Sequence, residues 1–400
     1  MHNIVKISDE VYWLGENDRH TQLFENYWPL ENGVSYNSYI IVDEKVCLID
    51  TMEASMANDF FEKISHLLGE RKIDYIVINH MEPDHSGAMK QILKEYPEAK
   101  VIATKMAFIM MKSFYGIDGA KHIVAKEGDT LNLGNHILKF VLTPWVHWPE
   151  TMMTYEINKK ILFSGDAFGS FGTLDGGLFD DEINLEFYED ELLRYYSNIV
   201  GKFSDKVQDA LHKLEKLELN LICATHGPIW RTEIKRIVND YQNWSSYQTQ
   251  KGVVIVFGSM YGNTEKMADA IARRLAERGI KNIRIYDSSK THISYIIRDI
   301  WKFKGLIIGS TTYNDGIFPK IEELINKIKY NNIKDHLLGL FGSGSWNVMS
   351  VKALKDFSNE INWELVHEPA EARSNPDITA FEKCAMIGDA MANRLKDIYG

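Results

Sequence analysis

Four side chains that can bind metal ions lie within one short segment, His80-Met81-Glu82-Pro83-Asp84-His85. The segment follows the nearly all-apolar run IDYIVIN, which predicts a buried strand. Because Pro83 disfavours helix, we expect an extended loop whose alternating side chains could serve two adjacent metal ions. A lone histidine is more often a hydrogen-bonded or surface residue. Four potential ligands directly after a buried strand favour a metal site instead.

Three further candidate ligands stand at the ends of predicted strands. His147 follows FVLTPWV, Asp166 ends ILFSGD, and His226 ends LICATHG. A buried carboxylate such as that of Asp166 is costly without a cation beside it. Strand ends are rigid positions from which loop side chains can reach a common site.

A second group of candidate residues follows the predicted strand VVIVFGS, where Ser259-Met260-Tyr261-Gly262-Asn263-Thr264 enters a predicted helix. Free backbone N–H groups and hydroxyls at a helix N-terminus bind anions. Neither GK[ST] nor GxGxxG occurs here, which excludes the loop of nucleotide hydrolases and the dinucleotide fingerprint. Neutral donors suit a terminal monophosphate such as that of FMN. An N-capped helix after a tight turn explains this loop alone equally well.

Two more loops follow predicted strands of the same region. Ser310-Thr311-Thr312-Tyr313-Asn314-Asp315-Gly316 comes after GLIIG, and Gly342-Ser343-Gly344-Ser345-Trp346-Asn347 comes after LLGLF. Ligands of a doubly wound sheet bind at the carboxyl ends of its strands, where these loops would meet. Tyr313 and Trp346 offer aromatic surface for a flat ring, although either alone is more often plain packing. The three loops together favour a flavin site.

The elements that must position these residues divide the chain into two parts. The first part shows strands interrupted by helices, with a hairpin that turns at Asp43 and Glu44. From Gly252 onward, five candidate strands alternate with helices, which predicts an open parallel sheet with helices on both faces. The polar stretch SSYQTQKG after a predicted helix over 232–247 is the expected linker. We therefore expect domains over 1–250 and 251–400.

Composition restricts the class of protein. Of 400 residues, 45% are hydrophobic and 25% charged, as in globular proteins. The last 150 residues hold 21 Lys and Arg against 18 Asp and Glu, so the totals of 45 and 56 leave a net charge of −14 for residues 1–250. Such an acidic part argues against binding of nucleic acid. Three distant cysteines, no long apolar run and no signal-like N-terminus predict a cytoplasmic protein without a membrane span.

The pattern HxExDH, followed by His147, Asp166 and His226 in this order and approximate spacing, resembles the metallo-β-lactamase-like domain of flavodiiron proteins. This family is also called A-type flavoproteins or rubredoxin:oxygen oxidoreductases. The segments TPWVHWPETM and SGDAFG match it too, and the resemblance covers essentially the whole chain. It implies an N-terminal αββα sandwich and a C-terminal flavodoxin-like domain with a doubly wound, parallel, five-stranded sheet.

The resemblance also implies a ligand set for two non-haem iron ions. It places His80, Glu82 and His147 on one iron, Asp84, His85 and His226 on the other, and Asp166 between them. Hydrolytic relatives of this fold usually have histidine where Glu82 stands, and the added carboxylate oxygen suits iron better than zinc. The resemblance places the FMN phosphate on residues 259–264 and the flavin ring between the other two loops.

By resemblance, we expect an oxidoreductase that reduces dioxygen to water or nitric oxide to nitrous oxide, with electrons relayed through FMN from a separate rubredoxin-like donor. The family works as a head-to-tail homodimer, and paired dimers form tetramers. One alternative is a zinc-dependent hydrolase of the same fold with an appended flavodoxin domain, and another is an electron-transfer flavoprotein with an inactive first domain. The sequence leaves open the preferred gas and the roles of Glu25, where some relatives carry histidine, and of Tyr195.

Overall fold

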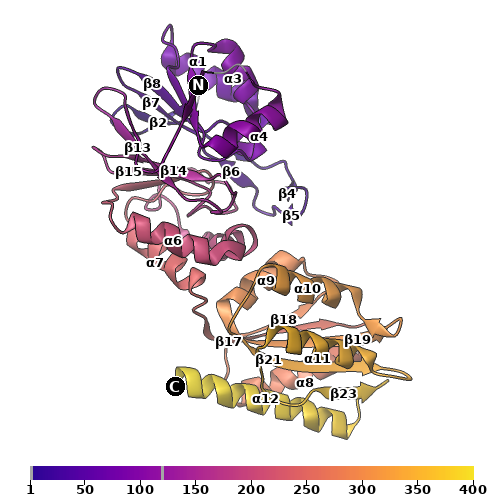
Figure 1. Cartoon of the computed structure of the whole chain (residues 1–400). Helices are drawn as coiled ribbons and strands as arrows, with labels where there is room; N and C mark the ends of the chain where they lie inside the picture. The colour runs from indigo at the N-terminus through magenta and orange to yellow at the C-terminus, as the bar shows by residue number, and fades with distance from the viewer. Residues whose placement is uncertain (1–2, 119–120) are drawn as a thin grey trace. The chain divides into compact units, whose positions relative to one another are not determined.

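The computed structural model describes residues 3–118 and 121–400. Contacts divide the chain into two compact units, Met1–Ser245 and Ser246–Gly400 (Figure 1). Within the described ranges, no helix has both the length and the apolar character needed to cross a membrane. Each unit has its own sheets and core, and each is described by itself.

The first unit is built on two sheets. In the described residues, the strands of the first sheet follow the spatial order β1-β2-β7-β8-β9-β10-β11. Their bounds are β1 (Val5–Ser8), β2 (Val11–Trp13), β7 (Tyr39–Val42), β8 (Val46–Ile49), β9 (Tyr75–Val77), β10 (Lys100–Ala103) and β11 (Lys121–Val124). β7 and β8 form the hairpin expected around Asp43 and Glu44, whereas β8 to β11 run parallel. The loop that carries His80 therefore leaves the carboxyl end of a central parallel strand.

The second sheet has the order β12-β13-β14-β15-β16. Its strands are β12 (Thr130–Asn132), β13 (Ile137–Leu142), β14 (Met152–Glu156), β15 (Ile161–Gly165) and β16 (Leu221–Ala224). Every residue of β14, β15 and β16 is buried, which matches the mainly apolar sequences of β15 and β16, whereas β14 also buries Thr154 and Glu156. β15 and β16 run parallel, so Asp166 and His226 leave the sheet at the same edge.

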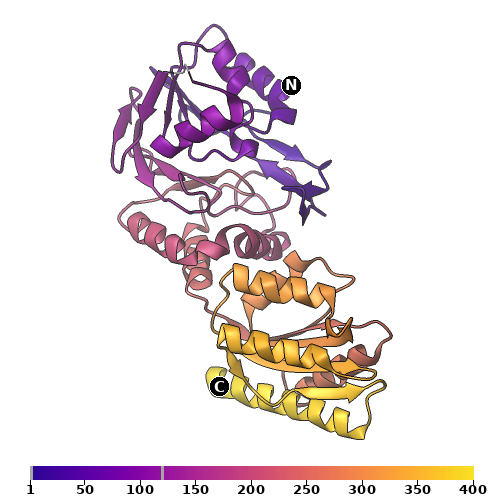
Figure 2. The same ribbon diagram turned by 45° about the vertical axis from the view of Figure 1, so that its right-hand side comes forward.

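Helices cover both outer faces of the paired sheets. α1 (Ala57–Leu68), α3 (Met89–Glu95) and α4 (Lys105–Tyr115) lie on one side, and α6 (Ser204–Leu214) and α7 (Ile234–Ser245) lie on the other (Figures 1 and 2). α6 buries Val207, Leu211 and Leu214, whose spacing of three and four residues makes one apolar face. The layers are therefore helix, sheet, sheet, helix, as expected.

Shorter elements complete the first unit. The pairs β3 (Glu16–Asp18) with β6 (Val34–Tyr36) and β4 (Leu23–Phe24) with β5 (Trp28–Pro29) are antiparallel. α5 (Glu189–Tyr195) continues through a π-helical segment, Tyr196–Val200, and a 3-10 turn, Gly201–Phe203. Further 3-10 turns span Ala54–Met56 and Leu185–Phe187.

The expectation that Pro83 keeps its segment from becoming helical is wrong. The short helix α2 (Pro83–Ser86) begins at this proline. Proline fits the first position of a helix because its fixed φ is already helical and its missing N–H has no partner there in any case. Asp84 and His85 therefore project from a helical turn rather than from an extended loop.

The second unit contains an open sheet in the order β18-β17-β19-β21-β22, with all neighbours parallel. The strands are β17 (Gln250–Gly258), β18 (Ile283–Asp287), β19 (Phe303–Tyr313), β21 (Leu337–Gly344) and β22 (Glu364–Leu365). The last of the five expected strands is split, because β23 (Ala370–Arg373) pairs with the second half of β21. Pro369 stands just before β23 and cannot donate to a strand ladder. β20 (Gly316–Ile317) adds a short antiparallel pair to β19.

Helices cover both faces of this sheet as well. α8 (Asn263–Glu277) and α12 (Ile378–Tyr399) share one apolar core with alternate residues of β17. α9 (Ile293–Lys302), α10 (Pro319–Tyr330) and α11 (Met349–Ile361) lie on the opposite face (Figures 1 and 2). The strand order reverses beside β17, and the loops after β17, β19 and β21 leave the same end of the sheet. That edge is where doubly wound sheets bind ligands.

Candidate functional site

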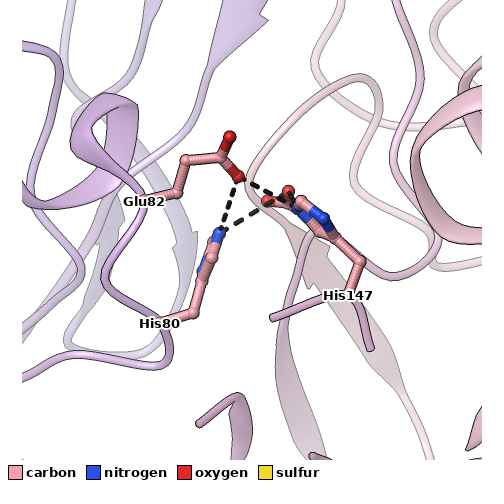
Figure 3. Close-up of side chains that lie close together, drawn as sticks. His80, Glu82 and His147 are labelled. Carbon is pink, nitrogen blue, oxygen red and sulfur yellow. Dashed lines mark hydrogen bonds and ion pairs between the residues drawn. The ribbon is translucent and has the colours of Figure 1, made fainter. Parts of the chain in front are cut away.

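The first group of predicted ligands contains His80, Glu82, His147 and Asp166, which lie close enough together to hold one metal ion. The Nε2 of His147 lies 3.0 Å from Oε2 of Glu82 and 2.9 Å from Oδ2 of Asp166. The Nε2 of His80 lies 3.6 Å from each of the same two oxygens. Figure 3 shows the side chains of His80 and Glu82, which come from one segment, converging with that of His147 from another.

The second group contains Asp84, His85 and His226. The Oδ2 of Asp84 lies 3.2 Å from Nε2 of His85 and 3.3 Å from Nε2 of His226. The two Nε2 atoms lie 2.9 Å apart. All three side chains are buried.

Asp166 faces both groups. Its Oδ2 contacts the first group, whereas its Oδ1 lies 3.2 Å from Nε2 of His85 and 3.9 Å from Nε2 of His226. One carboxylate oxygen toward each group is the arrangement that a bridging ligand needs. The structure therefore brings all seven predicted metal ligands together, although they come from four separate segments.

The unpaired atoms of these side chains fit metal ions. In the described part of the chain, buried atoms without a hydrogen-bond partner include both ring nitrogens of His80, Oε2 of Glu82, both carboxylate oxygens of Asp84 and Nδ1 of His85. Leaving one such atom buried and unpaired costs about 1–3 kcal/mol. Imidazole nitrogen combined with carboxylate oxygen is a donor set that suits iron.

The charges of the site favour cations. Burial alone lowers the pKa of His80 and of His147, but the carboxylates of Asp166 and Glu82 outweigh burial and raise both pKa values well above the usual histidine range. Burial also lowers the pKa of His85, but neighbouring carboxylates outweigh burial and raise this pKa to about 10. The carboxylates thus stabilise positive charge among the imidazoles, and bound metal ions would supply that charge.

The predicted flavin loops form a cavity of about 260 Å³ in the second unit. Ten of the predicted residues line it: Ser259, Met260, Tyr261, Asn263, Thr264, Thr312, Ser343, Gly344, Ser345 and Trp346. Gly262, Tyr313, Asn314, Asp315 and Gly316 are not among its lining residues. Gly262 has φ of +82° directly before α8, a conformation that glycine adopts without strain. Trp346 is 78% exposed beside this cavity, so its ring is free to stack on a planar ligand.

Sequence reasoning missed Ser374, which also lines this cavity. Ser374 follows β23 and its main-chain N–H donates to the main-chain oxygen of Gly344, which places the residue beside the third loop. Thr311 and Asn347, which stand in the predicted loops 310–316 and 342–347, line the cavity too.

Two family models match this chain. The model described as ODP family beta lactamase matches residues 34–227, and the flavodoxin model matches residues 255–385. The nitric oxide reductase of Moorella thermoacetica is 30% identical, and the match covers 98% of this chain and 99% of that protein.

Two solved structures have the same fold over nearly the whole chain. The rubredoxin oxygen:oxidoreductase of the anaerobe Desulfovibrio gigas is 28% identical with a TM-score of 0.95, and the match covers 100% of both chains. The flavodiiron protein of Giardia intestinalis is 26% identical with a TM-score of 0.94, over 99% of this chain and 97% of that one. This chain belongs to the flavodiiron proteins.

As a flavodiiron protein, the chain is an oxidoreductase whose cofactors are FMN and a non-haem diiron centre. The comparisons confirm the predicted family. They also confirm the predicted fold, a metallo-β-lactamase-like part followed by a flavodoxin-like part.

Residues around the predicted metal ligands of this flavodiiron protein fix those side chains in place, and sequence reasoning missed them. The hydroxyl of Thr225 donates to Oδ1 of Asp166 at 2.6 Å, and Nδ1 of His226 lies 2.8 Å from the main-chain oxygen of Ser35. The carboxylate of Asp50 accepts bonds from the main-chain and side-chain nitrogens of Asn79, at 2.7 and 2.8 Å. Asp50 ends the apolar strand VCLID just as Asp166 ends ILFSGD, and this shared pattern could have revealed it.

Two residues whose roles the sequence leaves open lie beside the ligands. Glu25 lines a cavity of about 410 Å³ together with Glu82 and Asp84. Burial, followed by the charge of Glu82, raises the pKa of Glu25 to about 7. The ring of Tyr195 is fully buried, with its centroid 5.6 Å from that of His226.

We predict that Thr225→Val will weaken iron retention. Valine keeps the shape of threonine but removes the hydroxyl that orients Asp166. Loss of such an outer partner typically weakens metal binding about 10–100-fold. Competition with a chelator, followed by iron analysis, measures the effect.

The matched control is Thr232→Val, because the hydroxyl of Thr232 donates to Asp180 at 3.0 Å, outside the metal groups. It should lose iron at the wild-type rate. Equal iron loss in both variants would show that the Thr225 hydroxyl does not support the site.

Proposed function

We propose that this flavodiiron protein reduces dioxygen to water or nitric oxide to nitrous oxide, with electrons passing through FMN to the diiron centre. The observation that carries the proposal is the position of Asp166, which turns one carboxylate oxygen toward each of two histidine and carboxylate groups. The names of two matched proteins, a nitric oxide reductase and a rubredoxin oxygen:oxidoreductase, support the same chemistry.

The proposed ligands are His80, Glu82 and His147 for one iron, Asp84, His85 and His226 for the other, and Asp166 as the bridge. When bound, the two irons and the flavin supply the electrons for reduction of the gas. The protein orients the imidazoles and carboxylates through fixed outer partners such as Thr225. The cavity beside Glu25 gives a small gas access to Glu82 and Asp84.

The proposed FMN site lies in the second unit. The phosphate would bind at residues 259–264, where β17 meets α8, and the ring would lie between the loops after β19 and β21. The buried hydroxyl of Thr264 and the nearby hydroxyl of Ser343, whose oxygens are 2.8 Å apart, are neutral donors of the kind that a monophosphate accepts. We therefore propose that residues 1–250 form the diiron domain and residues 251–400 the FMN domain.

Three further parts of the proposal concern partners and location. A separate rubredoxin-like protein is the proposed electron donor, in keeping with the name of the Desulfovibrio gigas relative. The proposed assembly is a head-to-tail homodimer, with tetramers as paired dimers. The proposed location is the cytoplasm, which suits the three free cysteines of this chain.

The direct test mixes the fully reduced protein with each gas in the absence of other oxidants. We expect rapid consumption of dioxygen or nitric oxide, and parallel turnover with one reduced donor would show which gas is preferred. An electron-transfer flavoprotein would consume neither gas rapidly. Zinc in place of iron, with esterase or thioesterase activity, would instead support the hydrolase alternative.

A further inference from the structure

A third cluster of possible metal ligands lies in the first unit, apart from the seven residues of the diiron centre. Glu10, Asp43 and His136 each offer one ligand atom, and these atoms lie within 4.8 Å of one another. Glu10 stands in the turn between β1 and β2, and Asp43 in the turn between β7 and β8. His136 precedes β13 in the other sheet. The cluster therefore joins the two sheets of the sandwich.

The ring of His136 is buried without a hydrogen bond. Its side chain is 0% exposed, and neither ring nitrogen has a hydrogen-bond partner in the part of the chain that the structure describes. Nε2 lies 3.4 Å from Oε2 of Glu10, and Nδ1 lies 3.4 Å from Oε1 of Glu156. Because an unpaired buried nitrogen is costly, a cation bound at Nε2 would stabilise the folded protein.

The spacing of these atoms fits a bound metal ion. Zinc bonds to nitrogen and oxygen are about 2.0–2.1 Å long, so two ligands of a tetrahedral zinc ion lie about 3.3 Å apart. The separation of 3.4 Å between Glu10 and His136 is close to that value. Histidines that bind metals usually direct their second ring nitrogen toward a carboxylate, and the buried Glu156 occupies that position.

Two carboxylates beside His136, those of Asp43 and Glu156, are already fixed in place. Asp43 accepts the main-chain N–H of His136 at 2.8 Å, and Glu156 accepts that of Ile137 at 3.2 Å. Glu10 is 42% exposed, which leaves an approach for an ion and for water ligands. Ligands held by other hydrogen bonds lose little freedom when a metal binds.

The charge of the cluster also favours a cation. Among residues 3–118 and 121–400, no Lys or Arg forms an ion pair with Glu10, Asp43 or Glu156. Burial alone lowers the pKa of His136, but Glu156, Asp43 and Glu10 outweigh burial and raise it. The cluster thus stabilises positive charge, which either a proton on His136 or a metal ion can provide.

We propose that Glu10, Asp43 and His136 bind one divalent transition-metal ion of the zinc type, which ties the two sheets together. Glu156 orients the imidazole through its other ring nitrogen, Nδ1. This site is separate from the diiron centre, because Asp43 precedes β8 whereas Asp50, which holds Asn79 beside the diiron ligands, follows it. The four residues of β8, which lie between these two aspartates, span roughly 13 Å.

The test adds Zn²⁺ to the protein loaded with FMN and both irons, removes loosely bound metal and measures zinc and iron per chain. We expect the wild type to retain one zinc ion in addition to its iron, and we expect Zn²⁺ to raise its melting temperature. Glu10→Gln should bind zinc at least about tenfold more weakly, with its iron unchanged. His136→Asn should behave alike, and if it does not fold, the exposed Glu10 variant still decides.

The matched control is Glu215→Gln. Glu215 also lies 3.3 Å from a histidine, His212, but that ion pair is exposed and contains a single carboxylate. This variant should retain zinc as the wild type does. Three outcomes would overturn the proposal: no zinc beyond the iron in the wild type, zinc that enters only in exchange for iron, or equal zinc in Glu10→Gln. In each case a proton on His136 would be the cation of the cluster.

Discussion

Asp166→Asn will lose most of its iron from both positions and, with it, gas reduction. The amide keeps the size of the side chain but removes one negative charge and replaces one oxygen with a donor nitrogen. Because Oδ1 and Oδ2 face different groups, one of the two irons would meet that nitrogen. Removing a residue that only supports a ligand typically weakens metal binding about 10–100-fold. Asp166 is itself a proposed ligand, so we expect the iron affinity to fall by more than that.

The measurement is iron per chain after chelation, together with turnover of each gas. Asp180→Asn is the control, because Asp180 is also a buried aspartate, but it accepts main-chain bonds from Arg231 and Thr232. That variant should be less stable yet keep its iron. Full iron and normal turnover in Asp166→Asn would remove Asp166 from the bridging position.

The sequence was most informative where a ligand ends a strand. A strand end combines an apolar run, which is easily recognised, with one polar residue whose burial requires a reason. Asp166 and His226 have this pattern, because they follow β15 and β16 directly or within two residues. The expectation that His147 also ends a strand is wrong, since β13 ends at Leu142, although the structure still brings His147 to the other predicted ligands. The regular alternation of strands and helices after Gly252 predicts the parallel sheet of the second unit for a similar reason, because parallel strands that are buried over most of their length have continuous apolar sequences.

The features that were missed depend on contacts between distant segments or on exact local geometry. Thr225 supports Asp166 across 59 positions of sequence, and nothing in the local sequence around Thr225 signals that bond. His136 shares the same limitation, since its partners Glu10 and Asp43 come from the other sheet. For Pro83, the sequence does not show where in a helix the residue would stand. Proline disrupts the interior of a helix but favours its first position, and α2 begins at Pro83.

Thr264→Val will weaken FMN binding while leaving the diiron centre intact. The side chain of Thr264 is fully buried in the first turn of α8 and lines the flavin cavity. Its hydroxyl is therefore well placed to donate to a phosphate at this helix N-terminus. A hydrogen bond to a charged group contributes about 1.5–3 kcal/mol, which corresponds to roughly 10–100-fold in the dissociation constant.

Quenching of flavin fluorescence during titration of the FMN-free protein measures this change, and iron analysis shows whether the metal site is affected. The control is Ser358→Ala on α11, which removes a buried hydroxyl that does not line the cavity. Valine preserves the volume of threonine, so a loss of affinity in Thr264→Val alone would identify the hydroxyl rather than packing as its cause. Unchanged FMN affinity in Thr264→Val would mean that the phosphate binds away from residues 259–264. The assignment of the other two loops to the flavin ring would then fail as well, because the three loops are proposed to bind one molecule.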